Sequence, residues 1–139
     1  MTWQKQYYKK NESKYHNQPV VYDGITFDSI HEKQRWCFLK LMERAGEISN
    51  LRFHVPFTLI PKGAVALLRM PDGKEVEIQK FDRKRYYEAD FVYINKKGEE
   101  IVEDFKGFET ETFKQKRILF NIIYGKDIKI VKQINEDIY

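Results

Sequence analysis

The sequence contains very little cysteine: Cys37 is the only one in 139 residues. A lone cysteine excludes a disulfide within the chain and argues against a structural zinc site, which usually takes several Cys or His ligands. It fits a reducing compartment, so we expect a cytoplasmic protein.

Long apolar stretches are also missing. No run approaches the roughly 20 residues of a membrane-spanning helix. The charged N-terminal stretch is not followed by the apolar segment of a signal peptide. We therefore expect no membrane segment and no signal peptide.

The remaining composition is that of one globular domain. Hydrophobic residues make up 42% and charged residues 33% of the chain, and the formal net charge is +4. A basic balance favours a polyanionic partner only weakly, because a solvated basic surface gives the same count. We predict a single domain over residues 19–139, preceded by a basic, tyrosine-rich arm over residues 1–18.

Hydrophobic patterns and turn residues predict an α/β fold with a mixed central sheet flanked by helices. We expect a small hairpin over residues 20–27 and a helix over residues 30–45 that ends at Gly46. Its apolar residues Trp36, Cys37, Leu39, Leu41 and Met42 indicate a broad buried face. A second helix should begin at Thr110 or Thr112 and end at Gly125.

Strands are predicted over residues 51–60, 86–94, 99–105 and 128–131. Pro56 places the first of these at a sheet edge or a bulge. The loop 95–98 makes the second and third strands antiparallel neighbours. Residues 63–85 form an inserted or projecting hairpin around the turn residues 71–73, and its role stays open.

An acidic pair and a lysine stand out on the two hairpin strands. Alternate strand residues share a face, so Asp104 and Lys106 should point the same way. Asp90 can lie across from Asp104 on the same face, and Glu32 could reach this place from the first helix. Buried carboxylates repel each other and lose water, and a bound cation offsets that cost.

The cation that fits best is Mg²⁺, with Mn²⁺ as a substitute, because Mg²⁺ takes oxygen ligands and keeps several waters. Such a site can polarise a phosphodiester and activate water, and Lys106 could orient or deprotonate that water, or stabilise charge on the phosphate.

The spacing of these residues resembles the PD-(D/E)XK nuclease signature: Asp90, thirteen intervening residues, then Asp104-Phe105-Lys106. A wider set of segments is similar to a family of small bacteriophage proteins without an assigned function, placed near endonuclease-I-like and Holliday-junction-resolving enzymes. These segments are Phe27-Asp-Ser-Ile-His-Glu32, Glu43-Arg-Ala-Gly-Glu-Ile48, Val55-Pro56, Tyr87-Glu-Ala-Asp-Phe-Val-Tyr93 and Val102-Glu-Asp-Phe-Lys-Gly107.

The resemblance covers roughly residues 14–131 and implies a restriction-endonuclease-like fold and Mg²⁺-dependent cleavage of DNA, in phage recombination or replication inside a bacterial host. It departs from the superfamily at Ala89, which stands in place of the proline, and at Asp104, which stands in place of the commoner glutamate. Glu103 lies beside Asp104, so which of the two binds metal stays open. Glu32 can equally be the far end of a capping box that begins at Ser29.

A basic patch on the second helix is a candidate DNA contact, although a solvated helix face has the same pattern. The DNA-contacting candidates are Lys114, Lys116 and Arg117, with Lys9, Lys10 and Lys14 of the arm. Cutting both strands would need two active sites, which a homodimer supplies. The competing functions are a DNA-binding module that has lost cleavage and a protein-interaction module; metal binding and cleavage separate them.

Overall fold

The computed structural model describes residues 18–138, so all but the last residue of the predicted basic arm, residues 1–18, lies outside the described part. The elements follow in the order β1 (Val20–Tyr22), β2 (Ile25–Phe27), α1 (Ile30–Arg44), β3 (Ile48–Ile60), β4 (Val65–Arg69), β5 (Glu75–Lys80), β6 (Arg85–Asn95), β7 (Glu100–Phe105), α2 (Glu111–Tyr124) and β8 (Lys129–Val131). None of the helices within residues 18–138 is long and apolar enough to cross a membrane.

The central sheet has four strands in the order β3-β6-β7-β8. The pairs β3–β6 and β6–β7 are antiparallel, whereas β8 lies parallel to β7. β3 is therefore an edge strand, as Pro56 predicts, because proline cannot donate to a sheet ladder. The predicted mixed α/β fold is confirmed.

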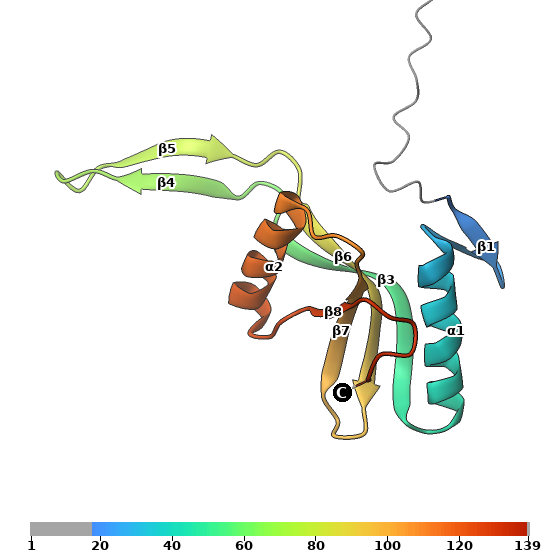
Figure 1. Cartoon of the computed structure of the whole chain (residues 1–139). Helices are drawn as coiled ribbons and strands as arrows, with labels where there is room; N and C mark the ends of the chain where they lie inside the picture. The colour runs from blue at the N-terminus through green and yellow to red at the C-terminus, as the bar shows by residue number, and fades with distance from the viewer. Residues whose placement is uncertain (1–17, 139) are drawn as a thin grey trace, which may run out of the picture.

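The two helices cover opposite faces of the sheet (Figure 1). Trp36 and Leu39 of α1 pack in one core cluster with Phe91, and Phe113 and Phe120 of α2 pack in the other. The predicted apolar face of α1 is wrong at one position: Leu41 is 58% exposed, whereas the charged Arg35 is fully buried. The face that α1 buries is therefore centred on Arg35, Trp36 and Leu39.

Both helices begin and end within one residue of the predicted positions: α1 ends at Arg44, and α2 uses Thr110, one of its two predicted caps. Ser29 caps α1 by accepting from the Glu32 N–H, and Thr110 caps α2 by accepting from the Phe113 N–H. The left-handed conformation of Gly125, with φ of 68°, ends α2. These caps satisfy N–H and C=O groups that a helix end leaves without partners.

Strands β4 and β5 form a separate two-stranded ribbon that projects from the sheet between β3 and β6 (Figure 1). Their hairpin turns at Gly73, whose φ is 87°. The predicted hairpin over residues 63–85 is thus confirmed as a projecting ribbon, and every residue of β5 is exposed.

The central strands change faces halfway along their length. On β6, Ala89 packs toward α2, whereas Phe91, two residues later, packs toward α1. Val55 of β3 likewise packs in the α2 cluster, whereas Leu51 packs in the α1 cluster. Strict alternation would put residues two apart on one face, so both strands are kinked at the same level. The kink falls at His54, whose φ is +48°.

Candidate functional site

The candidate site lies where β6 and β7 separate. Their paired residues end at Phe91↔Glu103, one position before Asp90 and Asp104 would meet. The Phe105 N–H instead donates to Asp90 Oδ2 at 2.8 Å. The Asp90 carboxylate therefore accepts a hydrogen bond that a backbone carbonyl would accept in a regular sheet ladder. This bond holds the Asp90 side chain next to β7.

Asp104 and Lys106 lie on one side of β7, as the alternation predicts. Lys106 Nζ lies 3.2 Å from Asp104 Oδ1 and 4.7 Å from the ring centre of Phe113. The Tyr87 hydroxyl donates to Asp104 Oδ2 at 2.6 Å. Asp104 is only 2% exposed, and its Oδ1 has no aligned hydrogen bond within the described residues. Asp104 Oδ1 is therefore a buried carboxylate oxygen in ion-pair contact with an ammonium group, and buried polar atoms without an aligned hydrogen bond are uncommon in proteins.

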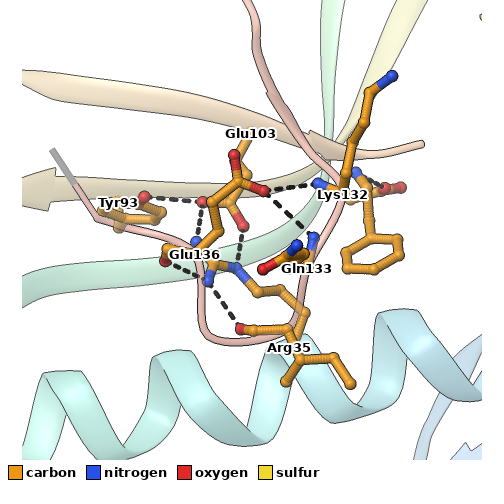
Figure 2. Close-up of polar contacts among 9 residues, drawn as sticks. Arg35, Tyr93, Glu103, Lys132, Gln133 and Glu136 are labelled. Carbon is orange, nitrogen blue, oxygen red and sulfur yellow. Dashed lines mark hydrogen bonds and ion pairs between the residues drawn. The ribbon is translucent and has the colours of Figure 1, made fainter. Parts of the chain in front are cut away.

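Glu103 points to the opposite side of β7, where Arg35 and Tyr93 bind its carboxylate. Its two carboxylate oxygens accept from Arg35 Nε at 2.6 Å and Arg35 Nη2 at 2.8 Å, and the Tyr93 hydroxyl donates to it at 2.7 Å (Figure 2). Both charged side chains are fully buried. The structure therefore separates the two neighbouring carboxylates: Asp104 lies with Lys106, and Glu103 belongs to an internal ion pair.

Glu32 forms half of the predicted capping box, because its side chain bonds the backbone N–H of Asp28 and not that of Ser29. Its N–H donates to Ser29 Oγ, while its Oε2 accepts from the Asp28 N–H at 3.3 Å, one residue before the cap. Its Oε1 lies 2.7 Å from His54 Nε2. The buried carboxylate of Glu32 thus faces the kink in β3 as well as the start of its own helix.

Three carboxyl groups influence one another in this place. Burial raises the pKa of Asp90 well above its usual range, and the negative charges of Asp104 and then Glu32 raise it further. Burial also raises the pKa of Asp104, although the charge of Lys106 and the hydrogen bond from the Tyr87 hydroxyl stabilise its ionised form and lower the pKa. Burial raises the pKa of Glu32, against its hydrogen bond with His54. Raised pKa values in a group of acids mark a place where negative charge lacks compensation.

The site fits a cation that brings most of its own ligands. Within residues 18–138, no group of three or more His, Cys, Asp and Glu side chains is arranged to hold a metal ion. Mg²⁺ does not need such a group, because it commonly binds through one or two carboxylates together with waters and substrate phosphates. Asp90 and Asp104 fit this donor set, and Asp104 Oδ1, which has no aligned hydrogen bond within the described residues, supports the fit.

The candidate DNA-contacting residues on α2 have different partners within the protein. Arg117 makes a two-pronged ion pair with Asp127, both contacts at 2.8 Å, and a further contact with Glu109. Lys114 lies 3.3 Å from Glu111. Lys116 lies over the ring of Tyr86, 6.0 Å from its centre. Lys9, Lys10 and Lys14 lie outside the described residues.

Sequence reasoning missed His54 and Arg35. His54 has no ligand spacing with another histidine, and its contact with Glu32 joins residues 22 positions apart. The Arg35–Glu103 pair joins residues 68 positions apart. Arg35 follows Lys33 and Gln34 in the sequence, so it resembles the polar residues of an exposed helix face. His31 borders the site by stacking on Phe105, with ring centres 6.0 Å apart.

The comparison with protein families gives a match over residues 12–136 to the family described as "Protein of unknown function (DUF1064)". No curated protein and no solved structure matches the chain.

Proposed function

This chain belongs to the DUF1064 family, and we propose that it is a Mg²⁺-dependent endodeoxyribonuclease with a PD-(D/E)XK type of site. The site would consist of Asp90 and Asp104 as metal-binding carboxylates, Lys106 as the catalytic lysine and Glu32 as a further acid. A restriction-endonuclease-like fold and a role in phage recombination or replication are part of the same proposal.

The observation that carries the proposal is the meeting of Asp90, Asp104 and Lys106 at the separation of two strands. Two acids with raised pKa values, an ammonium group at 3.2 Å and a buried oxygen without an aligned partner occur together. An internal ion pair would satisfy its own charges, as Arg35 and Glu103 do. This group leaves negative charge uncompensated, which favours a cation and an anionic substrate.

Hydrolysis adds one water across the phosphodiester bond. The water oxygen bonds to phosphorus, the bond from phosphorus to one sugar oxygen breaks, and that oxygen takes a proton. Bound Mg²⁺ supplies polarisation of the phosphate and of water in such a site. Lys106 would hold the attacking water or balance negative charge on the phosphate. Its ammonium group lies beside Asp104 and over the ring of Phe113.

The remaining protein groups keep these side chains in place. The Tyr87 hydroxyl donates to Asp104 Oδ2, and burial followed by the negative charge of Asp104 raises the pKa of that hydroxyl, so it stays protonated. The Phe105 N–H holds Asp90. Both acids therefore present a fixed geometry before metal or DNA arrives, which lowers the cost of organising the reaction.

A cleavage panel tests the proposal. Linear, nicked, flapped and four-way-junction DNA are incubated with the protein in Mg²⁺, in Mn²⁺ and in EDTA. We expect metal-dependent cleavage of at least one DNA, and Glu43→Gln, on the same helix as Glu32 but bonded to Leu51 N and Lys40, should cleave like wild type. DNA binding in Ca²⁺ without cleavage in Mg²⁺ or Mn²⁺ would instead indicate a DNA-binding module, and no metal or DNA binding would reject the proposal.

A further inference from the structure

His54 occupies the kink that brings the site together. It lies opposite Asp90, between the paired residues Phe53↔Phe91 and Val55↔Ala89. Its φ of +48° is in the left-handed region, which side chains other than glycine adopt at a cost. Such a conformation persists only where the surrounding structure imposes it, and these positions cluster at functional sites.

The imidazole ring is held from several sides. Nε2 lies 2.7 Å from Glu32 Oε1. The ring packs edge-on against Phe53 and Phe27, with ring centres 5.4 and 6.3 Å apart. About a quarter of the His54 side chain remains exposed, whereas the Glu32 side chain is 5% exposed. A fixed ring at the rim therefore contacts a buried carboxylate behind it.

Glu32 depends on this contact for its orientation. Its other oxygen has only the longer contact to the Asp28 N–H, at 3.3 Å. Asp90 faces His54 across β3 and β6, and the negative charge of Glu32 acts on Asp90. A rotation of the Glu32 carboxylate would therefore change the charge that surrounds Asp90.

We propose that His54 is a positioning residue for the metal-binding acids, holding the Glu32 carboxylate in place from the kink in β3. The inference rests on the proposed function, because it assigns His54 a part in that site. Hydrogen-bonding partners of metal-binding groups commonly contribute about 10–100-fold to metal affinity or activity. His54 acts through Glu32 and makes no contact with the reacting groups in this account.

Two substitutions separate positioning from folding. His54→Gln places an amide nitrogen near the position of Nε2 and can still donate to Glu32. His54→Asn places its amide nitrogen near the position of Nδ1 and falls short of Glu32, although asparagine tolerates a positive φ better than most residues. His54→Asn therefore fits the positive φ but loses the hydrogen bond to Glu32. His54→Gln keeps that hydrogen bond but adopts the positive φ less readily.

The experiment measures Mn²⁺ binding by calorimetry, the Mg²⁺ concentration for half-maximal cleavage, and the thermal melt of wild type and both variants. We expect His54→Asn to bind Mn²⁺ roughly 10–100-fold more weakly and to need correspondingly more Mg²⁺. We expect His54→Gln to recover most of the affinity.

Each other result counts against the inference. Equal Mn²⁺ affinity and Mg²⁺ dependence in wild type and His54→Asn would overturn it while leaving the nuclease proposal intact. Equal losses in both variants would assign His54 a merely structural role. A wild-type protein that neither binds Mn²⁺ nor cleaves DNA would reject the proposed function and this inference together.

Discussion

The buried pair of Arg35 and Glu103 allows a quantitative test of how the two neighbouring acids of β7 differ. Glu103→Gln keeps the shape of the side chain but leaves the Arg35 cation without its counter-charge in a fully buried place. Arg35 also donates to the carbonyl oxygens of Ile134 and Glu136, so it ties the C-terminal segment to α1. Removing one partner of a buried pair costs about 3–5 kcal/mol.

The size of the effect on melting follows from the length of the chain. Unfolding entropy near the midpoint is about 2.1 cal/mol/K per residue, or roughly 0.3 kcal/mol/K for 139 residues. Glu103→Gln should therefore melt roughly 10–17 °C below wild type in a thermal scan followed by circular dichroism. Asp104→Asn is the matched control, and it should not lower the melting temperature of the metal-free protein, because burial already raises the pKa of Asp104.

A small effect of Glu103→Gln would refute this reasoning. If it melts within a few degrees of wild type, or if Asp104→Asn is the more destabilising change, the assignment of the two acids is wrong. Should Glu103→Gln fail to fold, Arg35→Met combined with Glu103→Leu provides a second measurement. Replacing both charges by apolar groups is often neutral, so the double variant should melt above the single one.

Three further predictions concern the site. The raised pKa of Asp90 means that folding favours its protonated form. The stability that protonated Asp90 contributes is fully present below the unfolded pKa of about 3.9 and is lost as pH rises through the folded pKa. Asp90→Asn should therefore raise the melting temperature of the metal-free protein at neutral pH and leave it unchanged at the acid end of a pH series; a drop at neutral pH would contradict this. Lys106→Ala should lower the cleavage rate by about 10²–10⁴ while changing DNA affinity in Ca²⁺ by about one phosphate contact, and full activity would exclude the role of Lys106. DNA affinity should fall steeply between low and moderate salt in a binding titration, because each neutralised phosphate releases a counterion, and a flat dependence would remove the support for DNA as the partner.

Local patterns were enough to predict much of the fold and part of the site. Helix caps and turns depend on neighbouring residues, so Gly125 could be assigned from the sequence and the N-cap could be narrowed to Thr110 or Thr112, of which the structure has Thr110. The shared side of Asp104 and Lys106 follows from strand alternation, because the backbone of Lys106, one residue after β7 ends, still pairs with Val131 of β8.

Other features depend on contacts between distant parts of the chain. Alternation predicts one face for Ala89 and Phe91, and the kink at His54 and Asp90 breaks it. Leu41 fits an apolar stripe but is exposed, whereas α1 buries Arg35 because its guanidinium pairs with Glu103 on β7. A charged residue counts as solvent-facing in any local pattern, so a buried ion pair cannot be read from one strand or one helix.

The most direct measurement is Mg²⁺-dependent cleavage by wild type and Asp104→Asn, purified alike and both confirmed as folded. The substrates are supercoiled plasmid and a four-way junction, each with Mg²⁺ and with EDTA. The account predicts cleavage by wild type only in Mg²⁺ and none by Asp104→Asn in either condition. Equal cleavage by both proteins, or none by wild type in Mg²⁺ or Mn²⁺, would contradict it.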